Sequence, residues 1–232
     1  MGGNGLQEPA NTNRALTPHM LTIGLTQRVD VDNDVGERRD CLDQAWTALL
    51  VANGMCPVPL PNRVDDVSSL VSELGLDGVI LTGGNDLCAL QGGTNAAPER
   101  DTFEDKLLAD CFAADLPVLG VCRGLQMMVM HYGGRVVPLD GHVGTLHAIS
   151  TGGCIATPIT DRRRVNSFHR FGVHPDGLGS KLRPLAFAPD GTVEAVRHCT
   201  APQWAIFWHP ERGMSHSDDV QLLRAIFPGV AT

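Results

Sequence analysis

The stretch Pro117-Val-Leu-Gly-Val-Cys-Arg-Gly-Leu-Gln-Met-Met-Val-Met-His-Tyr-Gly-Gly134 changes its hydrophobic period in the middle. Residues 117–121 are an apolar run typical of a buried parallel strand. Apolar residues then recur at helical spacing until a Gly-Gly stop. Cys122 lies at the junction, between Gly120 and Gly124. Small residues at these positions permit a sharp strand-to-helix turn, as in the nucleophile elbow G-x-S-x-G.

Two interpretations of Cys122 follow from this turn. At a helix N-terminus, free N–H groups and the helix dipole favour a reactive thiolate. A buried structural cysteine is the alternative, because cysteine is among the most buried residue types. The turn alone does not decide between the two.

Length and charge exclude several classes of protein. A chain of 232 residues is long enough for one sizeable α/β domain. Its formal net charge of −8 argues against a nucleic-acid partner. No apolar run approaches transmembrane length, so no membrane association is expected.

Cysteine usage indicates the compartment. The seven cysteines are scattered, odd in number and without a C-x-x-C motif. No signal peptide is recognised. We therefore expect a reducing, cytoplasmic environment. The cysteines and histidines also lack the paired close spacings of zinc sites, so no metal is predicted.

Residues 1–19 carry no period and are predicted to be a disordered or loosely attached tail, followed by one domain over residues 20–232. In the first half, strands alternate with helices, which predicts a flavodoxin-like α/β fold with an open parallel sheet and helices on both faces. The strands are expected over 20–26, 57–61, 77–82 and 117–121, and the helices over 37–53, 66–74, 101–114 and after Cys122. The second half adds short β-strands at 135–138, 144–150, 154–158, 164–168, 182–188, 192–197 and 204–208, then a last helix to 227.

Three polar or glycine-rich segments follow predicted strands, namely Gln27-Arg28, Gly83-Gly84 and Cys122. The carboxyl ends of parallel strands meet at one edge of a sheet, where such folds bind their ligands. We therefore expect these segments to lie together.

His209 and Glu211 follow the apolar run 204–208. In an extended segment, residues i and i+2 point to the same face, so Glu211 can orient the imidazole and fix its tautomer. A cysteine nucleophile needs such a base and such an orienting group. Alone, His209 would be interpreted as a histidine in a surface loop. Catalysis is indicated by the joint occurrence of the cysteine turn and the strand-His-x-Glu pattern.

Four motifs carry a resemblance to a known family. Gly120-Val-Cys-Arg-Gly-Leu-Gln126 resembles the G-x-C-x-G-x-Q motif of class I (triad-type) glutamine amidotransferases, and Trp208-His-Pro-Glu211 resembles their F-H-P-E motif. Leu81-Thr-Gly-Gly84 is similar to their oxyanion loop. Val165-Asn-Ser-Phe-His169 resembles the V-N-S-x-H segment of the γ-glutamyl hydrolase branch. The resemblance covers nearly the whole chain after about residue 20.

The resemblance implies a role for each matching residue. Cys122 forms a thioester with a γ-glutamyl carbonyl, His209 carries the proton, and Glu211 orients His209. The backbone N–H groups of Gly84 and Arg123 form the oxyanion hole. These roles imply a hydrolase that releases L-glutamate and needs no cofactor.

Two further positions match substrate contacts of the family. Gln126 and His169 correspond to residues near the glutamyl group. An ordinary helix residue and a structural histidine are the respective alternatives.

The leaving group is indicated by the N-terminal region. Residues 26–29, 37–46, 59–62, 83–86 and 141–147 are similar to the γ-glutamyl-CDP-amidate hydrolases of phosphoramidate capsule biosynthesis, which release cytidine diphosphoramidate. This similarity makes Arg28, Arg38, Asn85 and His142 candidate substrate-binding residues. Arginine presents a planar fork to phosphate oxygens. A solvated surface position is the alternative for Arg38, and a structural position for His142.

Three other functions stay open. The chain is long enough for one domain only, which favours a stand-alone hydrolase over the glutaminase subunit of a two-chain amidotransferase with a separate synthase. A γ-glutamyl-GABA or γ-glutamyl-polyamine hydrolase is disfavoured by Phe168-His169-Arg170, where those enzymes often carry a second His and a Gln. A non-catalytic stress or binding protein with a cysteine elbow would lack the strand-His-Pro-Glu pattern.

Overall fold

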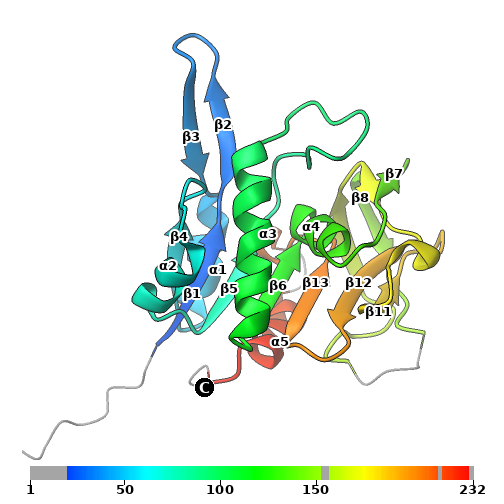
Figure 1. Ribbon diagram of the computed structural model, residues 1–232. Helices are drawn as coiled ribbons and strands as arrows, with labels where there is room; N and C mark the ends of the chain where they lie inside the picture. Colours follow the sequence, from blue (N-terminus) through cyan, green and yellow to red (C-terminus); the bar gives the residue numbers. More distant parts are fainter. Residues whose placement is uncertain (1–19, 153–156, 214–215, 230–232) are drawn as a thin grey trace, which may run out of the picture.

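A seven-stranded sheet forms the centre of the molecule, with strand order β11-β12-β13-β6-β5-β1-β4 (Figure 1). The computed structural model describes residues 20–152, 157–213 and 216–229. The predicted tail over residues 1–19 and most of the predicted strand 154–158 lie outside the described residues.

Five neighbouring strands of this sheet are parallel, as predicted for the first half. They are β1 (Leu21–Thr26), β4 (Met55–Leu60), β5 (Gly78–Leu81), β6 (Val118–Val121) and β13 (Gln203–Ile206). Two antiparallel strands, β12 (Val193–His198) and β11 (Leu182–Phe187), extend one edge. The predicted open, mostly parallel sheet is therefore confirmed.

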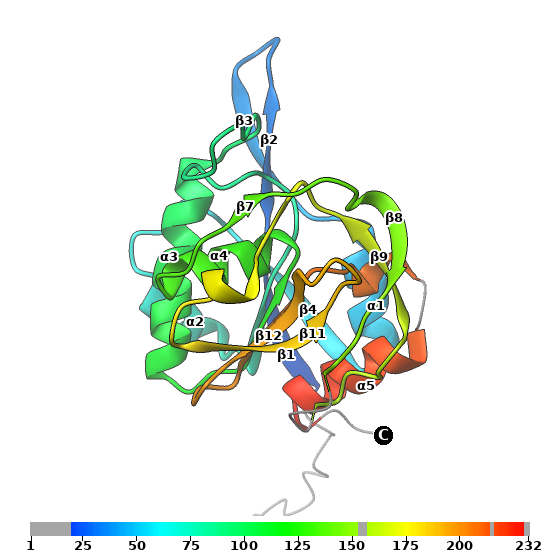
Figure 2. The same ribbon diagram turned by 90° about the vertical axis from the view of Figure 1, so that its right-hand side faces the viewer.

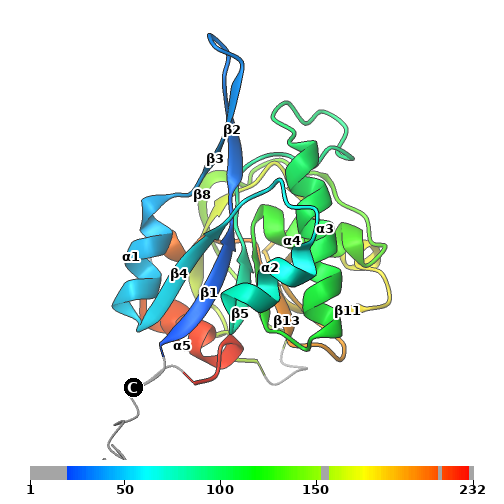
Figure 3. The same ribbon diagram turned by 60° about the vertical axis from the view of Figure 1, so that its left-hand side comes forward.

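Helices cover both faces of the sheet (Figure 3). One face carries α2 (Val67–Leu74), α3 (Pro98–Ala113) and α4 (Arg123–His131), and the other carries α1 (Gln44–Ala52) and α5 (His216–Ile226). Successive strand residues alternate between the two resulting cores: Val79 and Leu81 pack on the α3 side, whereas Ile80 packs on the α1 side. Burial on both sides explains why these strands are continuously apolar.

Three two-stranded sheets lie outside this layer. They pair β2 (Arg28–Asp32) with β3 (Glu37–Cys41), β7 (Val137–Pro138) with β10 (Phe171–Gly172), and β8 (Val143–Ala148) with β9 (Arg164–Phe168). The β2–β3 hairpin projects from the carboxyl edge of the parallel strands (Figure 1). Strands β7, β8 and β9 gather on the same side of the molecule as β11 and β12 (Figure 2). Single-turn 3₁₀ helices occur at Pro175–Gly177 and Pro210–Arg212.

The predicted helix over residues 37–53 is wrong in its first part. Residues 37–41 form β3, and the helix begins only after Asp43, whose side chain accepts a hydrogen bond from the Ala45 N–H. This cap fixes the helix start because it satisfies a backbone donor that has no partner inside the helix. None of the helices in the described ranges has the length and hydropathy needed to cross a bilayer.

Candidate active site

Cys122 occupies the predicted sharp turn between β6 and α4. Its backbone has φ 53° and ψ −100°, a conformation rarely adopted by residues with a side chain. The flanking glycines are required sterically. A Cβ on Gly120 would come within 2.7 Å of the Gly124 backbone, and a Cβ on Gly124 would collide with the Leu81 carbonyl oxygen. The turn therefore brings Cys122 to the carboxyl edge of the sheet at the start of a helix.

His209 and Glu211 follow β13, the strand next to β6. His209 is extended, but Glu211 lies in the 3₁₀ turn Pro210–Arg212 rather than in the extended segment that was predicted. The pairing nevertheless forms, since His209 Nδ1 lies 2.7 Å from Glu211 Oε1. Both side chains are almost fully buried, at 4% and 2% exposure. This bond directs Nε2 of the ring away from Glu211.

Gly83, in the loop after β5, lies next to both Cys122 and His209. A Cβ on Gly83 would lie 2.8 Å from His209 Cε1 and 3.7 Å from Cys122 Cβ. The loop after β5 therefore packs its bare backbone against the imidazole ring, with the cysteine beside it. Any side chain at this position would push the ring away.

The electrostatic environment of His209 favours its protonated form. Burial lowers the pKa of His209. Hydrogen bonding to Cys122 and Glu211, together with their charges, outweighs burial, so that the pKa of His209 is raised to about 9. A histidine with this pKa is cationic at neutral pH. The positive charge of His209 therefore lies beside Cys122.

Asn166 on β9 holds the backbone of His209, a role that was not predicted. The His209 N–H donates to Asn166 Oδ1 at 2.7 Å, and Asn166 Nδ2 donates to the His209 carbonyl at 3.0 Å. Asn166 is 5% exposed. It belongs to the quoted V-N-S-x-H segment, but nothing in its spacing indicated a partner 43 positions away.

Arg100 on α3 holds the loop after β5. Its Nη1 donates to the Gly83 carbonyl at 3.0 Å, and its Nη2 donates to the Thr82 carbonyl at 2.7 Å. Gly84 has φ 129°, and a Cβ there would lie 2.8 Å from Arg100 Nη1 and 2.7 Å from the Arg28 Cβ. The backbone that carries one predicted oxyanion donor is thus fixed from inside the molecule.

The second predicted donor is joined to the same group of buried charges. The side chain of Arg123 pairs with Glu104 and Asp101, and Glu104 also pairs with Arg100 at 2.8 Å. Burial raises the pKa of Glu104, but the charges of Arg100 and Arg123 lower it more, so that it falls below its usual value. We call Arg100, Asp101, Glu104 and Arg123 the arginine network; it carries two positive and two negative charges.

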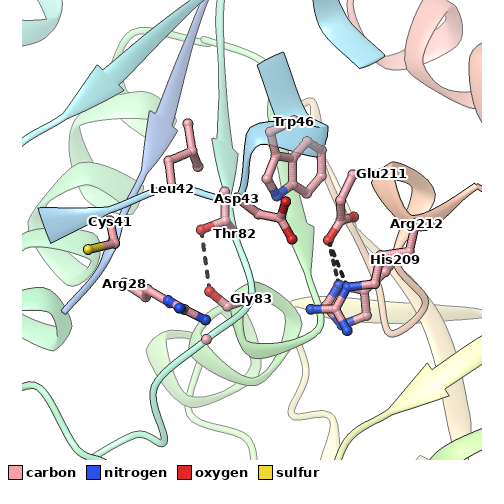
Figure 4. A pocket seen from close by; sticks show the side chains of 11 residues that line it. Arg28, Cys41, Leu42, Asp43, Trp46, Thr82, Gly83, His209, Glu211 and Arg212 are labelled. Atoms are coloured by element: carbon pink, nitrogen blue, oxygen red, sulfur yellow. Dashed lines mark hydrogen bonds and ion pairs between the residues drawn. The ribbon is translucent and has the colours of Figure 1, made fainter. Parts of the chain in front are cut away.

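A cavity of about 40 Å³ opens beside His209. Arg28 and Cys41 line one side of it and His209, Glu211 and Arg212 the other, with Gly83 between them (Figure 4). Arg212 was not among the predicted site residues. The lining thus carries two arginines and two carboxylates, Asp43 and Glu211, and Arg212 Nε lies 3.6 Å from Glu211 Oε1.

The remaining predicted substrate residues of the N-terminal half, Arg38 and Asn85, do not line this cavity. Arg38 pairs with Glu99 at 2.6 Å. The Asn85 side chain bonds both the N–H and the carbonyl of Val29, each at 2.8 Å, and so ties β2 to the loop after β5.

The predicted substrate residues of the second half lie together. Gln126 Nε2 donates to the Phe171 carbonyl at 3.1 Å, and His169 Nδ1 lies 3.1 Å from the same oxygen. The rings of His142 and His169 are 4.8 Å apart. None of these three is among the residues that line the cavity beside His209.

Comparisons with known proteins agree with this architecture. The chain is 30% identical over 210 residues to a γ-glutamyl-CDP-amidate hydrolase of Campylobacter jejuni subsp. jejuni serotype O:2, covering 89% of this chain and 98% of the relative. It is 28% identical over 227 residues to a γ-glutamyl-γ-aminobutyrate hydrolase of Escherichia coli O157:H7, covering 85% and 87%. A glutamine amidotransferase structure from Thermotoga maritima shares the fold, with a TM-score of 0.60 at 15% identity, covering 89% and 82%.

The family model described as peptidase C26 matches residues 22–211. This range includes the cysteine turn, the loop after β5 and the His-Pro-Glu segment. The chain belongs to the peptidase C26 family of class I glutamine amidotransferase-like enzymes.

Proposed function

We propose that this cysteine-dependent γ-glutamyl amide hydrolase acts through a Cys122–His209–Glu211 triad, and that its substrate is a γ-glutamyl-CDP-amidate. The observation that carries the triad is the arrangement around Gly83, where Cys122 lies at a helix start beside an imidazole whose Nδ1 is held by Glu211 at 2.7 Å. Glutamate and cytidine diphosphoramidate are the products, the latter serving phosphoramidate transfer to a capsule.

In the first step, the Cys122 sulfur attacks the γ-carbonyl carbon while His209 holds the thiol proton. The negative charge that develops on the carbonyl oxygen is stabilised by the N–H groups of Gly84 and Arg123, since donors placed at a developing oxyanion lower the barrier most. The arginine network supports this step because it fixes both backbone segments before substrate binds.

In the second step, the C–N bond breaks and His209 donates its proton to the leaving nitrogen. Water then adds to the thioester, with His209 now accepting a proton from the water, and glutamate leaves with the thiol restored. Glu211 keeps the ring oriented throughout.

The choice of a nucleotide-linked substrate rests on charge. Arg28 and Arg212 line opposite sides of the opening beside His209, together with the carboxylates of Asp43 and Glu211. A diphosphate would bind the forks of the two arginines and take Arg28 from its present partner, Asp30. The cavity itself, at about 40 Å³, has room for only a few atoms. The nucleotide would therefore lie outside it, along the β2–β3 hairpin.

The test is an assay of glutamate release from γ-glutamyl-CDP-amidate, γ-glutamyl-γ-aminobutyrate and L-glutamine in parallel. We expect the highest kcat/KM for the CDP-amidate, and we expect Cys122→Ala to lower kcat by at least about 10³-fold. A higher kcat/KM for γ-glutamyl-γ-aminobutyrate or glutamine would refute the substrate. Unchanged glutamate release by Cys122→Ala would refute the mechanism.

The two arginines give a sharper test of the diphosphate. Arg28→Gln and Arg212→Gln should each raise KM for the CDP-amidate about tenfold, since a charge-assisted hydrogen bond contributes about 1.5 kcal/mol. Neither change should alter KM for L-glutamine, which has no phosphate. Arg39→Gln is the matched control, because Arg39 lies on the same hairpin and pairs with an acid, as Arg28 does, but does not line the opening.

A further inference from the structure

Three histidines and a glutamate converge in the second half of the chain, behind the catalytic histidine. Glu194 lies on β12, His147 on β8, and His142 and His169 lie just before β8 and just after β9. Glu194 Oε1 is 3.3 Å from His147 Nε2, 3.5 Å from His169 Nε2 and 3.6 Å from His142 Nδ1. We call these four residues the histidine cluster.

The atoms that face the centre of the histidine cluster lack hydrogen-bond partners. This holds for His142 Nδ1, His147 Nε2, His169 Nε2 and both carboxylate oxygens of Glu194, all of which are buried. The Glu194 side chain is fully buried, and within the described residues no lysine or arginine pairs with it. Buried polar atoms are rarely left without partners, so five of them around one point indicate a missing ligand.

The outer atoms of two of these rings are hydrogen-bonded in the manner of metal ligands. His142 Nε2 lies 2.9 Å from Asp190 Oδ2, and His169 Nδ1 lies 3.1 Å from the Phe171 carbonyl. A ring nitrogen bonded to a carboxylate or carbonyl carries the proton, which leaves the opposite nitrogen with a free lone pair. Both free lone pairs point toward Glu194.

We propose that the histidine cluster binds a zinc ion through His142 Nδ1, His147 Nε2, His169 Nε2 and a Glu194 oxygen. A tetrahedral ion with bonds of about 2.0–2.1 Å separates its ligand atoms by about 3.3 Å. The three distances from Glu194 Oε1 are close to this value. The donor atoms of His142, His147 and Glu194 all lie within 4.8 Å of one another; His169 does not belong to this mutually close group and joins it through its 3.5 Å approach to Glu194, so it must move inward to bind the ion. Imidazole nitrogens with one carboxylate are a donor set that suits zinc.

The charges also balance. A divalent cation with three neutral imidazoles and Glu194 leaves one positive charge, which Asp190 offsets through its bond to His142. This assigns His142 and His169 to the metal rather than to the substrate.

Four protein ligands leave no open coordination position, so the ion is structural. It joins the β8–β9 hairpin to β12 of the central sheet. An isolated two-stranded hairpin is only marginally stable, and this one carries Asn166, which holds the backbone of His209. The zinc ion therefore acts on catalysis indirectly, by keeping Asn166 in place.

The first experiment measures metal content by mass spectrometry on full-length protein without an affinity tag. After reconstitution with zinc and desalting, we expect about one zinc ion per chain. Glu194→Gln and His147→Gln should lose it. His174→Gln, which changes an exposed histidine in the same half of the chain, should retain it. Wild-type protein without zinc, or equal zinc in Glu194→Gln and wild type, would overturn the proposal.

A second measurement uses wild-type protein alone, so that it holds even where a variant fails to fold. A chelator should lower the Tm, and added zinc should restore it. Cobalt in place of zinc should give the intense visible absorption of a four-coordinate ion. A Tm that is unchanged by the chelator, or the weak spectrum of six-coordinate cobalt, would contradict the site.

Discussion

Two glutamates of this molecule, Glu104 and Glu194, are equally buried, with no exposed surface, yet their surroundings differ. Glu104 pairs with two arginines of the chain. Glu194 faces three histidines, and both of its oxygens lack a hydrogen-bond partner. Burying a charge is unfavourable unless that charge is paired. The arginine network therefore balances its charge with arginines of the chain, whereas Glu194 faces histidines, which are the ligands of the proposed zinc ion.

The two clusters also hold opposite sides of the candidate site. The arginine network fixes the loop after β5, which packs against the ring of His209. The histidine cluster lies beside β9, whose Asn166 fixes the backbone of His209. His209 is thus held from one side by the loop that the arginine network fixes, and from the other by the hairpin that carries Asn166.

The largest effect is expected where the charge balance of the arginine network is broken. Glu104→Gln leaves Arg100 and Arg123 buried with too little negative charge and should lower the free energy of unfolding by about 3–5 kcal/mol. Urea denaturation measures this loss, which should be the same with and without a chelator. A loss that disappears in chelator would mean that the two clusters are not independent.

Removing zinc should have a smaller effect, and one that depends on ligand concentration. For wild-type protein with free zinc at 100 times the dissociation constant, binding contributes about 2.7 kcal/mol. Urea denaturation with zinc and with chelator should differ by this amount in the wild type and not at all in Glu194→Gln. A zinc-dependent difference that persists in Glu194→Gln would place the ion elsewhere.

Asn166→Ala tests the link from the hairpin to the catalytic histidine. It removes both hydrogen bonds to the His209 backbone and should lower kcat/KM about tenfold, which corresponds to about 1.4 kcal/mol of transition-state stabilisation. Zinc content should stay as in the wild type. Asn33→Ala, at the exposed turn of the β2–β3 hairpin, is the control. Full activity of Asn166→Ala would show that the two hydrogen bonds from Asn166 to the His209 backbone are not needed to position the imidazole ring.

The smallest effect is a shift in pH dependence. The pKa of His209 is raised to about 9, so its proton is present below that pH and is lost above it. We expect kcat/KM to fall as the pH rises through about 9, because the leaving nitrogen then lacks a proton donor. Glu211→Gln removes a bond and a charge that raise this pKa and should move the alkaline limb to lower pH. An alkaline limb at the same pH in Glu211→Gln as in the wild type would show that Glu211 does not raise the pKa that controls kcat/KM.

Local patterns in the sequence identified the elements that carry the candidate triad. The apolar run before Cys122 and the glycines around it predict the turn, because only small residues permit such close backbone contacts. The β2–β3 hairpin was missed because Cys41 continues the helical spacing of Ala45 and Leu49, whereas in the structure residues 37–41 pair with β2 and the helix begins after Asp43.

The buried clusters were harder to predict, since their members come together only in the fold. His142, His147, His169 and Glu194 come from four separate positions, without the close pairs by which zinc sites are recognised in a sequence. One signal was available: Glu194 stands between Val193 and Ala195 in a β-like run, where a buried carboxylate needs a partner. Asn166 and Arg100 form hydrogen bonds with backbone atoms of distant segments. Every residue type has these backbone atoms, so the sequence does not indicate which segment is bound.

The positive φ of Cys122 has a consequence for how such chains diverge. A residue with a side chain in this conformation is destabilising by about 1–3 kcal/mol, and glycine largely removes that strain. Cys122→Gly should therefore give a folded protein without catalytic activity and with little loss of stability. In a lineage released from selection for catalysis, the position of Cys122 is one where mutation to glycine is readily tolerated, so inactive descendants of this fold are expected to keep the turn and lose the cysteine.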